Sequence, residues 1–335
     1  PLAPHGGPTA TMPLLAGSPA IDAGSDVACA MPPVSGQDQR GVSRTVGAGP
    51  HCDIGAFEVE MKIAPFDFNG DRRTDRTVFR PSTGVWYSAL SDGTATATAW
   101  GESTDIDVAA DFDGDGTTDV AFWRPSTGQW LIVESSTGVV RVEEWGVAGD
   151  IPLAADIDGD GVADLVVYRP GRGQWFAKLS GGGTRLTYWG VSGDQPLLAD
   201  FDGDGKADLV IYRPSVGAWL VLLSGGGIQA VSWGLPGDIP VTGDWDGDGK
   251  ADAGIFRPAT GEWLIKASGG ATIVVNWGAS GDMPVTGDWD GDGKSDYTVW
   301  RPSTGAWFTQ LATGGTAAVD WGVSGDRPVG RLPGS

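Results

Sequence analysis

The aspartates of this chain recur in nine-residue segments whose spacing could support metal chemistry. In the segment that begins at Asp244, carboxylates occupy positions 1, 3, 5 and 9, and glycines at positions 4 and 6 permit tight winding. The residue at position 7 can add its backbone carbonyl. Hard oxygen ligands in this number suit Ca²⁺, whereas Mg²⁺ prefers a stricter octahedron with fewer protein ligands. The spacing predicts a calcium site, and the alternative is an Asp-Gly hairpin turn on a solvated face.

A calcium loop of the EF-hand or dockerin type shares the first five ligands of this pattern. Such a loop requires a bidentate glutamate at position 12. The six segments of this chain instead carry apolar residues at that position: Val78, Phe122, Val167, Ile211, Ile255 and Val299. The segment therefore leads into a strand, and the helix–loop–helix interpretation fails.

The acidic segment is part of a repeat of 44 or 45 residues. Its six copies begin at Asp67, Asp111, Asp156, Asp200, Asp244 and Asp288. An Arg-Pro pair keeps the same period, at Arg80, Arg124, Arg169, Arg213, Arg257 and Arg301. A Trp follows six residues later, at Trp86, Trp130, Trp175, Trp219, Trp263 and Trp307. Each unit closes with Trp-Gly, at Trp100, Trp145, Trp189, Trp233, Trp277 and Trp321.

Each unit reads as four short strands separated by turn residues. In the fourth unit, runs rich in β-branched and aromatic residues cover 208–212, 218–222 and 228–233, and 240–243 begins the next unit. Four strands in 44 residues with no helical periodicity are typical of propeller blades and exclude a helical solenoid. The sequence predicts an all-β, six-bladed β-propeller of four-stranded blades with a small N-terminal β-rich cap. The alternative is a seven-bladed or strand-exchanged ring.

The two ends of the repeat region leave its closure open. After Trp321 the chain begins another first strand, while residues 63–66 are expected to supply a first strand to the opening unit. Either the tail completes the final turn, or one of these strands is surplus. A surplus strand would pair with an edge of another copy and build a head-to-tail filament.

With these features, residues 61–330 resemble FG-GAP (VCBS-type) repeats, the calcium-loop β-propellers of integrin heads and secreted bacterial proteins. In that family the acidic loop joins the first two strands of a blade and binds Ca²⁺. The resemblance implies up to six structural Ca²⁺ ions and assigns the ligands by position. They are Asp111, Asp113, Asp115, Asp119; Asp156, Asp158, Asp160, Asp164; Asp200, Asp202, Asp204, Asp208; Asp244, Asp246, Asp248, Asp252; and Asp288, Asp290, Asp292, Asp296. The first loop departs from the pattern at Asn69 and Arg72, so Asp67, Asn69, Asp71 and Asp75 form the weakest site or an empty one.

The repeated Arg and Trp residues are expected to be structural. We expect each Arg of the Arg-Pro pair to stack on the repeat Trp or to pair with an Asp of a Gly-Asp turn. The alternative is a set of ligand-binding cations. Blade-to-blade packing is favoured for the repeat Trp residues over sugar-stacking platforms, and Trp123 and Trp300, which stand outside the register, are expected to be more exposed.

Residues 1–60 lack the repeat and form a separate segment before the propeller at 61–335. The stretches 14–24, 38–41 and 52–58 resemble the closing segment of secreted bacterial β-helix proteins of the choice-of-anchor Q type. That resemblance, together with a start at Pro1, implies a processed chain or a piece of a larger precursor. In an exported protein Cys29 and Cys52 are expected to form a disulfide. The alternative is two free buried thiols.

The chain carries a formal net charge of −21, and 23 of its 43 acidic residues lie in the six acidic segments. This acidity argues against nucleic acid or an anionic membrane as partner. With two histidines and no apolar run of membrane-spanning length, His-based catalysis and membrane insertion are not expected. No Ser/His/Asp set is available, and the glutamates form no visible pair, although a hydrolase built from an Asp pair stays an alternative.

Together these features predict a non-catalytic, calcium-stabilised propeller outside the cell or on a bacterial surface, acting in adhesion or scaffolding. A self-assembling filament subunit is one form of this role. Expected partners are other copies of the chain, a cell-surface protein or a glycan. The alternative function is a lectin-like carbohydrate-binding module.

Overall fold

The chain divides into two units, Pro1–Ile63 and Ala64–Ser335, and the computed structural model describes residues 64–331. The predicted N-terminal cap, the choice-of-anchor Q resemblance and the Cys29–Cys52 pair lie outside the described residues. Within residues 64–331, no helix is long and apolar enough to cross a membrane.

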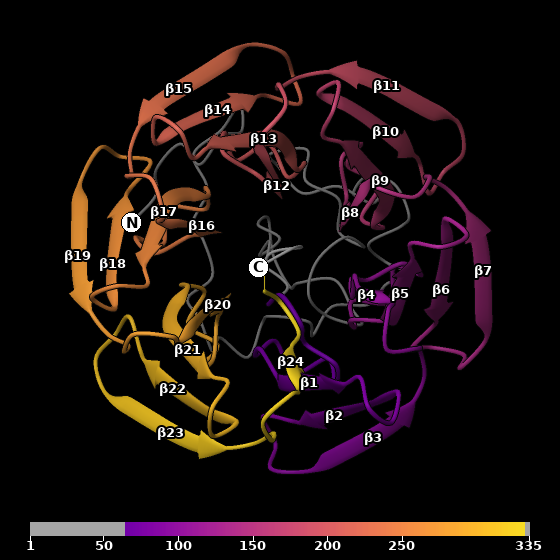
Figure 1. Ribbon diagram of the computed structural model, residues 1–335, viewed down its shortest axis with the longest axis horizontal. Coiled ribbons are helices and arrows are strands. Elements are labelled where there is room, and N and C mark those ends of the chain that lie inside the picture. The colour runs from indigo at the N-terminus through magenta and orange to yellow at the C-terminus, as the bar shows by residue number, and fades with distance from the viewer. Residues whose placement is uncertain (1–63, 332–335) are drawn as a thin grey trace, which may run out of the picture. The chain divides into compact units, whose positions relative to one another are not determined.

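The described residues form six antiparallel four-stranded sheets arranged as the blades of a ring (Figure 1). In chain order the strands are β1 (Arg76–Arg80), β2 (Val85–Ala89), β3 (Ala95–Ala99), β4 (Ile106–Asp107), β5 (Val120–Arg124), β6 (Gln129–Val133), β7 (Val140–Glu144), β8 (Ile151–Ala155), β9 (Asp164–Arg169), β10 (Gln174–Lys178), β11 (Thr184–Tyr188), β12 (Gln195–Ala199), β13 (Asp208–Arg213), β14 (Ala218–Leu222), β15 (Ile228–Ser232), β16 (Ile239–Gly243), β17 (Asp252–Arg257), β18 (Glu262–Lys266), β19 (Thr272–Asn276), β20 (Met283–Gly287), β21 (Asp296–Arg301), β22 (Ala306–Gln310), β23 (Thr316–Asp320) and β24 (Arg327–Pro328). Blades 2 to 6 each contain four consecutive strands, from β4–β7 to β20–β23. The six-bladed β-propeller predicted from the repeat is confirmed.

The ring is closed by the C-terminal end of the described chain. Strand β24 pairs with β1, which makes it the innermost strand of blade 1 in the order β24-β1-β2-β3. The expected first strand at residues 63–66 is wrong for its described part, because Pro65 and Phe66 form a turn and Phe66 has a φ of 60°. The tail therefore completes blade 1, and the surplus strand considered above is not found in the part of the chain that is described.

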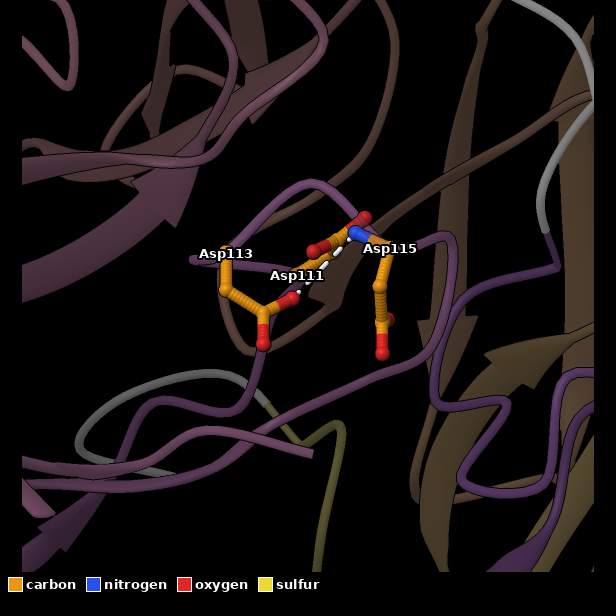
Figure 2. Close-up of side chains that lie close together, drawn as sticks. All are labelled: Asp111, Asp113 and Asp115. Carbon is orange, nitrogen blue, oxygen red and sulfur yellow. Dashed lines mark hydrogen bonds between the residues drawn. The ribbon is translucent and has the colours of Figure 1, made fainter. Parts of the chain in front are cut away.

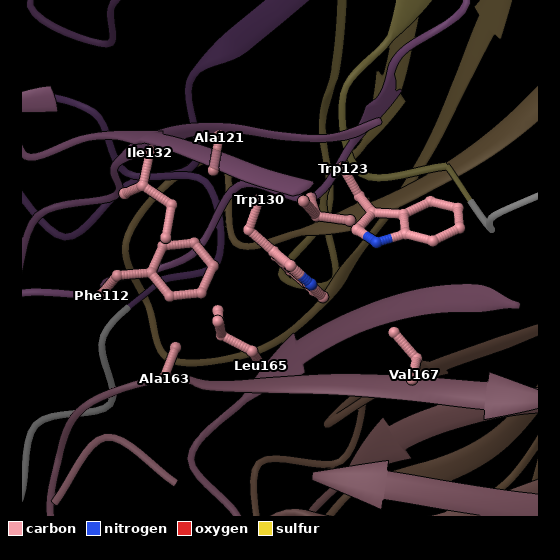
Figure 3. Close-up of a cluster of buried hydrophobic side chains, with 9 residues drawn as sticks. Phe112, Ala121, Trp123, Trp130, Ile132, Ala163, Leu165 and Val167 are labelled. Carbon is pink, nitrogen blue, oxygen red and sulfur yellow. The ribbon is translucent and has the colours of Figure 1, made fainter. Parts of the chain in front are cut away.

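Each interface between blades is a hydrophobic core that neither blade could bury alone. One such cluster joins Trp123 and Trp130 of blade 2 to Leu165 and Val167 of blade 3 (Figure 3). At the closure, Val78 of blade 1 packs in one cluster with residues of blade 6. The adjacent blades pack against both faces of the second strand of each blade. This burial on both sides explains why that strand is a nearly continuous run of apolar residues.

The tryptophans join the blades as well as filling them. The six Trp residues of the third strands are at most 1% exposed. Each closing Trp donates its indole N–H to a carbonyl of the next blade, and the ring is completed by Trp321, whose Nε1 lies 3.0 Å from the oxygen of Tyr87. Blade-to-blade packing is thus confirmed as the role of the repeat Trp residues.

The expected exposure of Trp123 and Trp300 is wrong, since they are 0% and 1% exposed. Both lie directly before the Arg of the Arg-Pro pair, where the other blades have Phe79, Tyr168, Tyr212 and Phe256. They therefore occupy an aromatic core position of the repeat.

Every Arg of the Arg-Pro pairs makes a two-bonded ion pair with a buried aspartate. Arg213 donates from Nε and a terminal nitrogen to Asp194 at 2.7 and 2.8 Å, and the same carboxylate accepts the backbone N–H of Val191. The six pairs are Arg80–Asp326, Arg124–Asp105, Arg169–Asp150, Arg213–Asp194, Arg257–Asp238 and Arg301–Asp282. The expected pairing with Gly-Asp turns is confirmed for five of the six Arg residues, and Arg124 pairs instead with Asp105, which follows a threonine. Stacking on the repeat Trp is not observed, because Arg80, Arg169 and Arg301 lie over Tyr87, Phe176 and Phe308 instead.

Replacing one of these aspartates should be costly. We expect Asp194→Asn to lower the free energy of unfolding by about 2 kcal/mol, below the usual cost of breaking a fully buried pair because Arg213 retains solvent contact. Urea denaturation measures the loss. Asp92→Asn, which changes an exposed acid, should leave stability close to that of the wild type, and equal effects of the two variants would contradict a structural role for the pair.

Candidate metal centres

The nine-residue acidic loops join the first and second strands of blades 2 to 6, and in blade 1 the loop precedes β1. Position 1 organises each loop. Asp200 accepts the backbone N–H of Gly203 on Oδ1 at 2.6 Å and that of Gly205 on Oδ2 at 2.9 Å. Both glycines have positive φ, 79° and 82°, which side-chain-bearing residues rarely adopt. In the first loop Arg72 occupies the second of these positions with a φ of 70° and is therefore strained.

Position 9 is buried and ties the loop to a second segment of the same blade. Asp208, with no exposed surface, accepts the N–H of Phe201 at 2.8 Å and the N–H of Ser224 at 2.7 Å. Ser224 lies in the turn after the third strand, and the same two bonds recur in all six blades. The position-9 carboxylate therefore fixes where the loop lies on its blade.

The turn residue that meets position 9 was missed by sequence reasoning. It follows position 1 by 24 residues in every unit, as Ser91, Ser135, Ser180, Ser224, Ser268 and Ala312. The serine hydroxyls also bond the position-5 carboxylate, as Ser180 does to Asp160 at 2.5 Å. The constant spacing of 24 residues from position 1 could have revealed this turn residue in the sequence. Small polar residues are so common in turns, however, that the spacing alone did not single it out.

Five loops gather three carboxylates each, with one oxygen from each carboxylate within 4.8 Å of the others. Figure 2 shows the group of Asp111, Asp113 and Asp115. The groups are Asp111, Asp113, Asp115; Asp156, Asp158, Asp164; Asp200, Asp202, Asp208; Asp244, Asp246, Asp248; and Asp288, Asp290, Asp296. The fourth predicted ligand of each loop, at position 5 or 9, lies outside these groups. Among the described residues, Asp67, Asp71 and Asp75 do not form such a group, and the Asn69 amide donates to Asp71. That the first loop is the weakest site stays a prediction.

The carboxylates of these groups fit a divalent cation. At position 3 of three loops, one buried oxygen lacks a hydrogen-bond donor: Oδ1 of Asp158, of Asp202 and of Asp290. A buried anionic oxygen without a partner is costly, and the cost grows with other carboxylates close by. An ion placed among the three acids would supply the missing partner. The donor set consists of hard oxygens, which Ca²⁺ prefers.

Burial raises the pKa of the position-9 carboxyl groups. It brings those of Asp75, Asp119, Asp208 and Asp252 to about 6 and that of Asp296 to about 7, from an ordinary value of 3.8. The backbone N–H bonds to each carboxylate oppose the rise, and the other aspartates of the loop add to it. Without a cation, these groups bind protons more tightly in the folded chain than in the unfolded one.

This difference gives a pH dependence whose sign changes with calcium. In chelator the folded state holds the extra protons, so stability should fall as pH rises from about 4 through 7. With saturating Ca²⁺ the ion competes with those protons, so its stabilisation should shrink as pH falls below about 6. We expect the melting temperature in chelator to be higher at pH 5 than at pH 7.5, and the gain from calcium to be smaller at pH 5. Melting curves with the opposite order would contradict the assignment.

Comparison with known proteins supports the repeat type. A model of the FG-GAP-like repeat matches residues 156–211, and a model of the FG-GAP repeat matches residues 192–231. No curated protein matches the chain. Neither the VCBS type nor the choice-of-anchor Q segment is shown by these matches, and both stay predictions.

Solved structures share the fold at low sequence identity. A Bacteroides caccae protein of unknown function has a TM-score of 0.51 at 9% identity, covering 76% of this chain and 98% of its own. Virginiamycin B lyase from Staphylococcus aureus has a TM-score of 0.50 at 10% identity, covering 73% of this chain and 80% of its own. An Agrocybe aegerita lectin specific for non-reducing terminal N-acetylglucosamine has a TM-score of 0.49 at 18% identity, covering 72% and 73%. Together, the fold and the repeat matches describe a six-bladed β-propeller in which residues 156–231 match models of the FG-GAP repeat.

Proposed function

We propose that this protein is a non-catalytic, calcium-stabilised propeller that acts outside the cell as a scaffold for adhesion. The observation that carries the calcium part is the buried position-3 oxygen without a donor, which recurs in three loops beside two further carboxylates. Five Ca²⁺ ions would reduce the formal net charge from −21 to −11. The bound ions would then be needed for the stability of the folded propeller.

The geometry of the described residues supports a role other than catalysis. The chain has two histidines, His5 and His51, too few for most His-based catalytic sites. A hollow of about 450 Å³ lies beside Asp150, Arg169 and Arg172, but Asp150 is fully engaged with Arg169 at 2.7 and 2.8 Å. A carboxylate held in this way is a poor general base. The lyase among the similar structures shares the fold, and propellers host many functions.

An adhesive role is supported by apolar side chains presented at equivalent positions of the repeat. Val147, Val191, Leu235 and Val323 are 49–58% exposed, each directly after the closing Trp-Gly. Each donates its backbone N–H to the ion-paired aspartate three residues later, so the turn that carries it is rigid. Single exposed apolar residues are common on protein surfaces, so the support for adhesion comes from their recurrence at the same position in four blades, which offers a partner repeated apolar contacts. We take a cell-surface protein as the partner.

The other roles considered from sequence have less support. The filament role depended on a surplus strand, but β24 is used within blade 1. For the lectin-like role, sugar stacking on the repeat Trp residues has less support, because the third-strand Trp residues are buried and the closing ones bond to the next blade. Both become outcomes of the test.

Calcium binding is tested by isothermal titration of chelator-treated protein with CaCl₂. We expect about five sites, the number of carboxylate groups, and a triple variant, D158N/D202N/D290N, should lose binding at three of them. Asp92→Asn, an exposed acid outside the loops, is the matched control. A triple variant that binds as the wild type does would contradict the site assignment.

Adhesion is tested with labelled protein on intact cells of the producing bacterium. We expect binding in Ca²⁺ that is lost in EGTA, after proteolytic shaving of the cells, and in a variant with Ser at Val147, Val191, Leu235 and Val323. Loss on glycosidase treatment alone would favour the lectin, and concentration-dependent growth of the sedimentation coefficient would favour the filament. Either result would overturn the proposed partner.

A further inference from the structure

The acidic loops are connected to one another around the ring. The backbone N–H at position 8 of each loop donates to the position-1 carbonyl of the loop in the preceding blade, at 2.6–2.7 Å. The six bonds are Thr118–Asp67, Ala163–Asp111, Ala207–Asp156, Ala251–Asp200, Ser295–Asp244 and Thr74–Asp288. Because the last of these joins blade 1 to blade 6, the chain of loops is closed. Neighbouring loops are therefore held in a fixed register.

Because of this register, the side chain at position 7 of each loop packs against the loop of the preceding blade. In every blade that side chain lies within 3.2 Å of the place where a Cβ on the preceding position-4 glycine would be. The contacts are Thr117 over Gly70, Val162 over Gly114, Lys206 over Gly159, Lys250 over Gly203, Lys294 over Gly247 and Arg73 over Gly291. Glycine at position 4 is required by its own positive φ, and its lack of a side chain leaves room for the position-7 side chain of the neighbouring blade.

Four of these six side chains carry a positive charge, and two place it on the backbone of a predicted ligand. Lys206 Nζ donates to the carbonyl of Asp158 at 2.6 Å, and Lys294 Nζ donates to the carbonyl of Asp246 at 2.9 Å. The Asp111 group instead meets the uncharged Val162. Arg141 also reaches that loop, at 3.2 Å from the oxygen of Phe112, but its Nε lies 3.8 Å from Glu134, which opposes its charge.

We propose that the position-7 side chain sets the calcium affinity of the site in the preceding blade. A lysine there stabilises the metal-free loop by offsetting its acidic charge and lowers the affinity of that loop for Ca²⁺ by repelling the ion. With an apolar residue at position 7, no positive charge offsets the carboxylates of the loop, so their full negative charge attracts the ion. The inference rests on the proposed calcium binding and adds a specificity-determining residue that belongs to another blade.

One positive charge acting on a divalent ion a few ångströms away across a partly solvated site changes its affinity on the order of tenfold. Replacing Lys206 by Met removes the charge while keeping an unbranched stem over Gly159. We therefore expect Lys206→Met to bind Ca²⁺ about tenfold more tightly at the Asp156 site and to have a less protected metal-free loop there. The reverse change, Val162→Lys, should weaken the Asp111 site by a similar factor, with Val162→Met as its size control.

Hydrogen exchange over a calcium titration of the full chain resolves the sites individually. The amides of Gly159 and Gly161, which bond to Asp156, report on that loop. In Lys206→Met the midpoint for residues 156–164 should shift to about tenfold lower Ca²⁺, and protection of this loop in EGTA should fall. The midpoint for residues 111–119 should not change.

The outcomes separate this inference from the proposed function. Wild-type loops whose exchange does not respond to Ca²⁺ would overturn the calcium function itself. Loops that respond normally, with an unchanged or higher midpoint at 156–164 in Lys206→Met, would overturn the tuning role alone. A purely structural lysine would reduce protection with and without calcium and would not tighten binding.

Discussion

Chelating calcium is expected to lower the melting temperature of this protein by about 25 °C. An ion that binds only the folded state contributes about 2.7 kcal/mol at one hundred times its Kd, so five ions contribute about 13 kcal/mol. For a propeller of this length, each kcal/mol corresponds to about 2 °C. Differential scanning calorimetry at pH 7.5, in 5 mM CaCl₂ and in EGTA, measures the shift.

The control for chelation is the D158N/D202N/D290N variant, in which the orphaned buried oxygens belong to neutral amides. The melting temperature of this variant should depend less on calcium. For the wild type in chelator, adding Mg²⁺ in place of Ca²⁺ should restore little of the lost stability. If the wild-type curve in excess chelator coincides with the curve in calcium, the loops are acidic turns and the metal interpretation is wrong.

Removing the closing strand should have the second-largest effect. A chain ending at Asp326 keeps the ion pair with Arg80 but loses β24, the Val329 N–H bond to Thr77 at 2.9 Å, and Val329 itself, which is 3% exposed. Loss of a buried Val and several backbone hydrogen bonds amounts to about 5 kcal/mol. We expect a lower melting temperature and a broader transition, because blade 1 is left with three strands and an open ring.

A milder pair of variants tests the same closure without truncation. Val329→Ala should destabilise the protein by about 1–2 kcal/mol, whereas Val323→Ala, at a position 49% exposed in the same segment, should be close to neutral. Arg331, which is 3.1 Å from Asp107 of blade 2, also belongs to this closure. A truncated chain as stable as the full one would show that β24 does not close the ring.

The architecture was predictable because the repeat states the same local pattern six times. In the fourth unit the predicted strand 218–222 coincides with β14, and 208–212 falls one residue short of β13. Strand spacing, turn residues and loop positions all agree within each copy, so errors in one copy are corrected by the others. The Arg–Asp pairs were predictable for the same reason, except Arg124, whose partner Asp105 follows Thr104 instead of a glycine.

The features that could not be predicted depend on contacts between blades. Closure of the ring by β24 is a pairing between the two ends of the repeat region, which no period within one unit encodes. The burial of Trp123 follows from its position on a strand covered on both faces, and its own sequence neighbourhood does not reveal this. The Lys206 bond to Asp158 spans 48 residues and is visible only once neighbouring loops are placed side by side.

The most direct test of calcium binding in the acidic loops is a crystal structure grown in CaCl₂, with anomalous differences recorded at long wavelength. We predict five anomalous peaks per chain, one within each carboxylate group, with oxygen ligands at about 2.4 Å. Calcium binding in these loops is contradicted if the loops contain only water while calcium sites elsewhere in the crystal are fully occupied. It is also contradicted if no peak lies beside Asp158, Asp202 and Asp290.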